Sequence, residues 1–106
     1  IDFAIHNGID IAAEEGTPVS AAFNGTVEEV GYNDVRGNYI LLSHGGDTKT
    51  LYMHCSEIIA EKGAVVRSGE IIAKVGNTGW STGAHLHFSI SVNGKYCNPE
   101  WLLNDL

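Results

Sequence analysis

Apolar and polar residues alternate most regularly over residues 84–92, which read AHLHFSISV. In an extended strand, successive side chains point to opposite faces of the sheet. One face then carries every second residue from Leu86 to Val92, and the other carries His85 and His87 with two serines. The pattern predicts a strand that packs its apolar face into the core. Its other face projects two imidazoles side by side, with Cα atoms about 7 Å apart.

Shorter apolar runs, separated by Gly, Asn and Asp, fill the rest of the chain and predict an all-β domain. We expect a mainly antiparallel sheet that curls towards a sandwich or open barrel. One helical turn is expected at Ser56–Glu61, and a short C-terminal helix at Asn98–Leu103, with Asn98 as its cap and Pro99 at its first position. The predicted strands are Gly8–Ala12, Val19–Ala22, Thr26–Tyr32, Tyr39–Ser43, Thr48–His54, Ile71–Val75 and His85–Val92.

Two further strands place polar side chains opposite apolar ones. Asp10 lies between two isoleucines that face the core, so its carboxylate faces away from the core, and His6 precedes it by four residues. In the strand beginning at Thr48, alternation groups Tyr52 with His54 on one face. We therefore expect three separate strands to offer His or Asp on the face that is not buried among aliphatic residues.

The composition narrows the class of protein. The 106 residues suit one domain, residues 1–106, which we interpret as excised from a longer chain because it begins with Ile1 and shows no signal peptide. Six basic and thirteen acidic residues argue against a nucleic-acid partner. No apolar run is long enough to cross a membrane. Whether Cys55 and Cys97 form a disulfide is left open.

The polar residues suit a catalytic zinc ion. Such ions take three protein ligands, mostly His with an occasional carboxylate, and keep a further position for water. His6, Asp10 and one of His85 and His87 would provide two imidazoles and a carboxylate; the residues alone do not decide which. The remaining histidine and His54 would then handle protons or polarise the attacked carbonyl.

Three motifs, in order, resemble those of the lysostaphin-type (LytM-type) zinc metalloendopeptidases. HNGIDIA is similar to the first signature of that family, LYMHCS to its L-Y-x-H-L-S segment, and GNTGWSTGAHLHF to its glycine-rich loop and H-x-H strand. KGAVVRSGEIIAKVG is similar to a turn that the family shares with hammerhead folds, which implies a duplicated hybrid motif. Cys55 and Ala84 depart from the family pattern, where Leu and Pro are usual, and neither change removes a functional group.

The resemblance implies the role of each residue. His6, Asp10 and His87 would bind Zn²⁺, and His54 and His85 would be the catalytic pair. The activity it implies is hydrolysis of peptide bonds in the stem peptides or cross-bridges of bacterial peptidoglycan, outside the cytoplasm, by a secreted or cell-wall protein. The motifs do not indicate which bond is cut.

Other interpretations concern both the function and single residues. The alternative function is a non-catalytic zinc-binding scaffold, amidase activator or sporulation-channel domain of the same family. A carrier domain built on the hammerhead turn is disfavoured because no Met-Lys-Met hairpin is present. Trp80 and Tyr32 are candidate substrate-binding residues that would line the groove, with packing as the alternative role for Trp80. His44 is interpreted as a structural histidine or one that supports the site indirectly.

Overall fold

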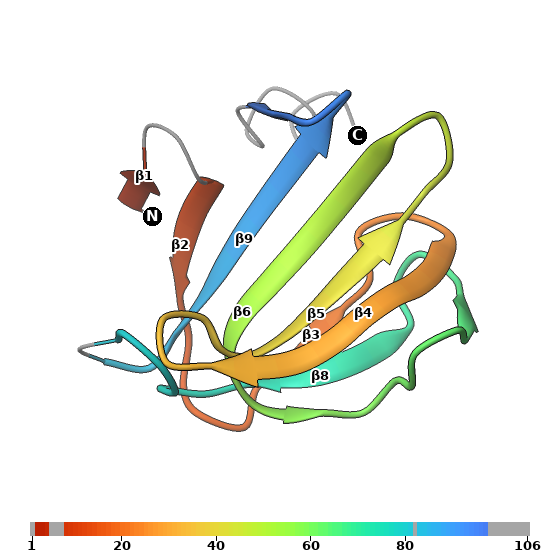
Figure 1. The fold of residues 1–106 in the computed structure, drawn as a ribbon. Helices are drawn as coiled ribbons and strands as arrows, with labels where there is room; N and C mark the ends of the chain where they lie inside the picture. The colour runs from red at the N-terminus through yellow and green to blue at the C-terminus, as the bar shows by residue number, and fades with distance from the viewer. Residues whose placement is uncertain (1, 5–7, 82, 98–106) are drawn as a thin grey trace.

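The protein folds as a curled, fully antiparallel β-structure (Figure 1). This computed structural model describes residues 2–4, 8–81 and 83–97. Its strands are β1 (Asp2–Ala4), β2 (Gly8–Ala12), β3 (Pro18–Ser20), β4 (Gly25–Asn33), β5 (Gly37–Ser43), β6 (Thr48–Ile58), β7 (Val65–Val66), β8 (Ile71–Val75), β9 (His85–Val92) and β10 (Lys95–Cys97).

The long strand β6 connects the two parts of the sheet. Its first residues, from Thr48 to Met53, pair with β9, and β5 lies on its other side. Its last residues, from Cys55 to Ile58, pair with β8, which in turn pairs with β3. The main sheet runs in the order β1-β2-β9-β6-β5-β4-β7. Figure 1 shows the β3–β8 arm lying against β4 and β5 rather than extending their layer.

The hydrophobic core lies between the main sheet and the β3–β8 arm. Every second residue of the central strands points into it, as the pleat of a strand requires. On β9, Leu86 lies on the same face as Phe88 and Ile90 and packs against the core, as the alternation predicts. The buried residues of this core include Ile9, Ile40, Leu42, Tyr52, Ile72, Phe88 and Ile90.

The predicted strands are confirmed, with shifts at their ends. β3 begins and ends earlier than expected, and β1, β7 and β10 were not predicted. The helical turn at Ser56–Glu61 is wrong, because the chain continues as β6 up to Ile58 and pairs with β8 there. The expected helix at Asn98–Leu103 lies outside the described residues. The described residues form no helix, so none of them provides a membrane-spanning helix.

Candidate metal centre

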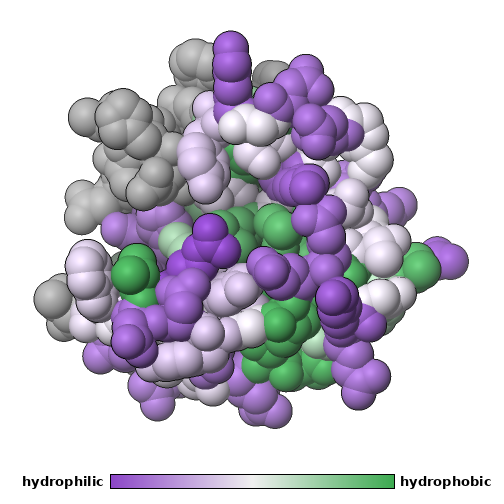
Figure 2. Space-filling model, viewed as in Figure 1, coloured by the Kyte–Doolittle hydropathy of each residue, from purple (hydrophilic) through white to green (hydrophobic). Residues whose placement is uncertain are grey.

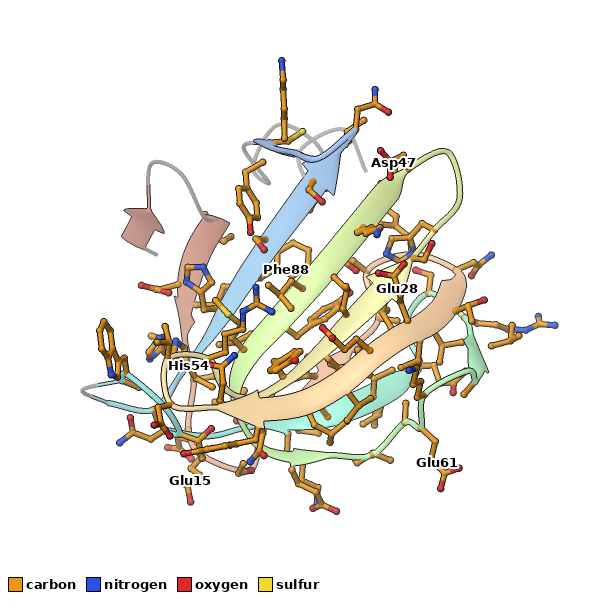
Figure 3. The ribbon with its side chains drawn as sticks, viewed as in Figure 1. Glu15, Glu28, Asp47, His54, Glu61 and Phe88 are labelled. Carbon is orange, nitrogen blue, oxygen red and sulfur yellow. The ribbon has the colours of Figure 1, made fainter. Side chains whose placement is uncertain are left out.

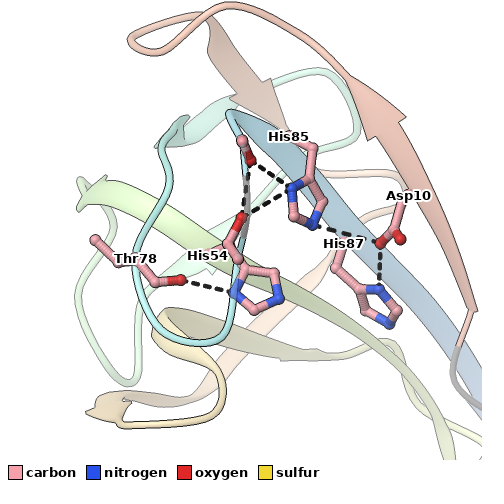
Figure 4. A network of polar contacts seen from close by, with 7 residues as sticks. Asp10, His54, Thr78, His85 and His87 are labelled. Atoms are coloured by element: carbon pink, nitrogen blue, oxygen red, sulfur yellow. Dashed lines mark hydrogen bonds and ion pairs between the residues drawn. The ribbon is translucent and has the colours of Figure 1, made fainter.

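Neighbouring strands place a carboxylate against two imidazoles at one end of the sheet. β2 and β9 pair so that Asp10 lies opposite His87, and Ala12 lies opposite His85. Directly paired residues project to the same face with their side chains close together. The His87 Nδ1 atom accordingly lies 2.6 Å from Asp10 Oδ1, and His85 Nε2 lies 3.6 Å from the same oxygen (Figure 4).

Gly8 allows β2 to approach β9 this closely. Its φ is +121°, a region that residues with a side chain rarely adopt. A Cβ atom at this position would collide with the carbonyl oxygen of Phe88 and with the backbone of Ser89. The glycine in the HNGIDIA motif therefore has a steric role: it fixes the register that puts Asp10 beside His87.

His54 reaches the cluster by a route that strand alternation does not predict. Tyr52 faces the core, and alternation would place His54 on the same side. The expectation that these two residues share a polar face is wrong. His54 has φ +66°, and the pairing of β6 with β5 is irregular beside it. The altered backbone turns its ring to the opposite face, where its centroid lies 5.0 Å from that of His85 and 6.2 Å from that of His87.

Backbone carbonyl groups fix the orientation of both candidate catalytic imidazoles. His54 Nδ1–H donates to the Thr78 carbonyl at 2.7 Å, and His85 Nδ1–H donates to the Gly83 carbonyl at 2.8 Å, with Ser81 Oγ 3.0 Å away (Figure 4). A carbonyl oxygen can only accept, so the proton lies on Nδ1 in each ring. In the neutral form of such a ring the lone pair is on Nε2, and for His85 this atom lies 3.6 Å from Asp10 Oδ1.

The surroundings of His54 favour its neutral form. Burial lowers its pKa, the nearby His85 and His87 rings lower it further, and the hydrogen bond to Thr78 and the charge of Asp10 oppose the shift. The His54 side chain is nearly inaccessible, with 7% of the residue exposed. The ring is therefore held neutral at neutral pH, which a proton acceptor requires.

The described donors suit a zinc ion but do not complete a site. Among residues 2–4, 8–81 and 83–97, no group of three His, Cys, Asp or Glu side chains is placed to hold a metal ion. The expected ligand His6 lies outside these residues. Asp10 and His87 are in direct contact, and their oxygen and nitrogen donors are of the kinds that zinc prefers. Two of the three predicted ligands are thus placed within reach of one shared cation.

The other predicted residues lie at different distances from this cluster. Trp80 lies on the loop that brings Thr78 to His54 and is 76% exposed; its backbone N–H donates to the Val35 carbonyl in the turn between β4 and β5. Tyr32 on β4 pairs with Asn38 on β5, so its side chain leaves the sheet on the face opposite to that of Tyr39. No hydrogen bond or ring contact of Tyr32 to the cluster is found among the described residues.

His44 belongs to a different network. Its Nδ1–H donates to the Asn24 carbonyl at 2.7 Å, and its Nε2 lies 2.7 Å from Thr50 Oγ1. Its ring also contacts the edge of the Phe23 ring. These contacts are structural. His44 precedes the first residue of β6 by four positions, and Figure 3 shows the neighbouring Asp47 at the other end of this strand from His54.

Thr78 is a positioning residue that sequence reasoning did not single out. Its hydroxyl donates to the Cys55 carbonyl at 2.7 Å and accepts from the Asn38 N–H at 3.1 Å, while its own carbonyl accepts from His54. The loop is thereby fixed to β5 and β6. The contact to His54 uses a backbone atom, which any residue type would supply, so no sequence signal marks it.

The two cysteines do not form a disulfide. Cys55 is buried in the core, and Cys97 lies opposite Ile90 at the pairing of β10 with β9; both are free. Burial raises the pKa of the Cys55 thiol to about 12. Cys55 is therefore a small apolar core residue.

Comparison with known proteins identifies a peptidase family. The profile of Peptidase family M23 matches residues 4–99. An uncharacterized metalloprotease of Haemophilus influenzae is 46% identical over 95 residues, which cover 89% of this chain and 20% of that protein. The peptidoglycan DD-endopeptidase ShyC of Vibrio cholerae is 40% identical over 95 residues, covering 90% and 22%. The chain thus spans about a fifth of the length of these curated relatives.

Solved structures share the same fold. The catalytic domain of the antimicrobial peptidase lysostaphin from Staphylococcus simulans superimposes with a TM-score of 0.89 at 33% identity, covering 97% of this chain and 86% of that one. A zinc-containing peptidase from Vibrio cholerae gives a TM-score of 0.84 at 39% identity, covering 87% and 28%. The expected all-β architecture is confirmed by these likenesses.

Proposed function

The chain belongs to peptidase family M23, and from this premise we propose that it is the zinc-dependent peptidase domain of an enzyme that hydrolyses peptide bonds in bacterial peptidoglycan. Relatives named as peptidoglycan DD-endopeptidases support the substrate class. The chain covers only about a fifth of their length, so the proposal concerns this domain. The substrate lies outside the cytoplasm, and the domain would act there, in a secreted or cell-wall protein.

One observation carries the proposal. Three strands that are distant in sequence bring Asp10, His87, His85 and His54 to one end of the sheet, with Asp10 in contact with both histidines of β9. Polar groups that converge in this way, with a perturbed histidine among them, are the pattern of a catalytic site.

We assign the metal to Asp10 and His87, with His6 as the third ligand. When bound, zinc supplies a Lewis acid that polarises the scissile carbonyl and activates water. Asp10 also neutralises part of the charge of the ion. The sheet supplies the rigid support, because both described ligands belong to paired strands rather than loops.

His54 and His85 would move the protons. Hydrolysis adds one water across the amide: the carbonyl carbon gains a hydroxyl group and the leaving nitrogen gains a proton. Both rings are oriented by carbonyl acceptors on Nδ1. A neutral Nε2 can accept the proton from water and return it to the amine. Trp80, exposed on the loop that holds Thr78, would form a wall for the peptide.

The test is digestion of purified muropeptides of defined cross-link type, with mass spectrometry of the products and metal analysis of the same sample. We expect cleavage at an amide, about one zinc per chain, loss of activity with a chelator and recovery on adding zinc. Cleavage that persists in metal-free protein would contradict the proposal. Bound zinc with no cleavage of any muropeptide would instead support the non-catalytic scaffold of the same family.

A further inference from the structure

Arg36 lies in the wall of a hollow beside the candidate metal centre. The hollow, about 130 Å³ in volume, is lined by Val35, Arg36, Leu51, Met53, Ser89 and Tyr96. Met53 pairs with His87, and Leu51 pairs with Ser89, so this hollow continues along the face that carries the cluster. Figure 2 shows apolar residues between hydrophilic ones near the centre of the face it displays.

The backbone of Arg36 is fixed on both of its polar groups. Its N–H donates to Asn33 Oδ1 at 2.7 Å, and its carbonyl accepts from the N–H of His54 at 2.8 Å. Arg36 is therefore attached directly to the residue whose ring enters the cluster. The hydrogen bond between the Arg36 carbonyl and the His54 N–H therefore helps to position both residues relative to the scissile bond.

The guanidinium rests on a platform made by Tyr39. The Arg36 Cζ atom lies 5.0 Å from the centroid of the Tyr39 ring, within the range of a cation–π contact. The Tyr39 ring in turn crosses β4 at Gly31, where an added Cβ would lie 2.9 Å from the phenol oxygen. Glycine at this position leaves the space for the ring, and the ring supports the arginine.

Within the described part of the chain, the positive charge of Arg36 has no anionic partner. Among the described residues, no ion pair or side-chain hydrogen bond involves the Arg36 guanidinium, although Asp34 lies in the same turn. By contrast, Lys49 pairs with Glu28, and Lys74 pairs with Glu57. The chain as a whole carries a net charge of −7, so an anionic peptide is repelled by most of its surface.

We propose that Arg36 binds a free carboxylate of the peptide next to the scissile bond, so that this domain prefers anionic peptide cross-links to neutral ones. The inference rests on the proposed peptidase function. A planar guanidinium forms two parallel hydrogen bonds with a carboxylate, which a lysine cannot reproduce. Because Tyr39 and the fixed backbone hold the group in place, less side-chain freedom is lost on binding.

The test compares two cross-linked muropeptide dimers that differ in a single group. In one dimer the peptide residue next to the cleaved bond keeps a free carboxylate. In the other dimer this carboxylate is converted to an amide. We expect the wild type to prefer the free acid by about 10-fold in kcat/KM, as for one charge-assisted interaction. Arg36→Gln should raise KM for the free acid by about the same factor, leave kcat nearly unchanged and leave the amidated dimer unaffected. Arg36→Lys should keep part of the preference.

Arg67→Gln is the matched control. It removes the same charge from an exposed position beside β7, in a different hollow shared with His44, and should leave the preference intact. Thermal unfolding and zinc content must match the wild type in each variant. Equal effects of Arg36→Gln on both dimers, or a wild type without preference, would overturn the inference.

Binding separates this inference from the proposed function. Calorimetry with the metal-free protein measures the affinity for each dimer without turnover. Tighter binding of the free acid that disappears in Arg36→Gln would support the arginine's role even if neither dimer were cleaved, in which case the proposed function alone would fail. Equal affinity of the metal-free protein for both dimers would reject the carboxylate site.

Discussion

Two histidine networks lie towards opposite ends of β6, and they differ in how the ring nitrogens are used. At one end, His44 Nδ1–H donates to the Asn24 carbonyl, and Nε2 contacts the Thr50 hydroxyl. At the other, the Nδ1 atoms of His54 and His85 donate to carbonyls, and the Nε2 of His85 lies 3.6 Å from Asp10 Oδ1. Both ring nitrogens of His44 are consumed by the fold, whereas the second network leaves capacity for another molecule.

The network around His44 has only one consistent direction of donation. His44 Nδ1–H donates to the Asn24 carbonyl, so Nε2 of the neutral ring accepts from the Thr50 hydroxyl. Thr50 Oγ1 then accepts from the Tyr52 hydroxyl at 2.9 Å, and the Tyr52 oxygen accepts from the Ala22 N–H at 3.0 Å. Burial raises the pKa of Tyr52, which keeps its proton in place. A chain of groups that is satisfied internally in this way stabilises the fold and has nothing to offer a substrate.

The strongest test of this difference makes the same substitution in both networks. Asparagine tolerates the left-handed backbone of His54 but cannot accept a proton. We expect His54→Asn to lower kcat/KM by roughly 10²–10⁴-fold, the usual contribution of general acid–base catalysis, with zinc content close to wild type. Loss of the hydrogen bond to the Thr78 carbonyl should lower the free energy of unfolding by about 1 kcal/mol, too little to account for the loss of activity. Muropeptide hydrolysis, metal analysis and thermal unfolding measure these quantities.

His44→Asn serves as the counterpart. It removes two hydrogen bonds and the contact with Phe23, so unfolding should become easier by about 1–3 kcal/mol. The activity of the remaining folded protein should not change. A large loss of activity in this variant at full folding would mean that the two networks are coupled and that the comparison is wrong.

A loss of stability of similar size, with no loss of activity, is expected from removing one hydroxyl of the structural network. Tyr52→Phe leaves the Ala22 N–H and the Thr50 hydroxyl without their partner in a buried region. We expect a loss of about 1–3 kcal/mol in the free energy of unfolding, measured with urea, and unchanged kcat/KM. Tyr32→Phe removes the same group from an exposed side chain and should change stability by less than about 0.5 kcal/mol. If Tyr32→Phe instead raised KM, Tyr32 would contact the substrate.

The smallest effect concerns Cys55, which follows His54 directly but points into the core. In the folded protein at pH 8, a thiol reagent should modify Cys97 and spare Cys55, because burial holds the Cys55 thiol protonated. The folded pKa of about 12 lies above the ordinary value of 9.0. The contribution of this thiol to stability is therefore complete below about pH 9 and falls between about pH 9 and 12, where only the unfolded state ionises.

Mass spectrometry after labelling counts the modified thiols, and labelling in denaturant should reach both. A Cys55→Ala variant should lose the alkaline part of the stability decrease. Equal labelling of both cysteines in the native state would show that the end of β6 opens readily, and the rigid support assumed for His54 would then be absent.

The sequence by itself determined most of the architecture and part of the site. Strict alternation over 85–92 places His85 and His87 on one face of the strand and Phe88 and Ile90 on the other face. The isoleucines that flank Asp10 place its carboxylate on the outer face. These outcomes depend on the pleat of single strands, which neighbouring residues specify. The three motifs and their order indicated the family. They also led to the choice of His87 over His85 as the expected ligand. That choice came from the resemblance.

Only the tertiary structure decided how His54 joins the site. Alternation assigns it to the face of Tyr52, and the helical turn expected just after it is replaced by strand pairing with β8. Its backbone is left-handed. Its N–H donates to the Arg36 carbonyl and its ring donates to the Thr78 carbonyl, and these residues are 18 and 24 positions away in sequence. The same contacts bring Arg36 to the hollow. Such a conformation is unfavourable locally and is held by distant partners, so no pattern of neighbouring residues encodes it.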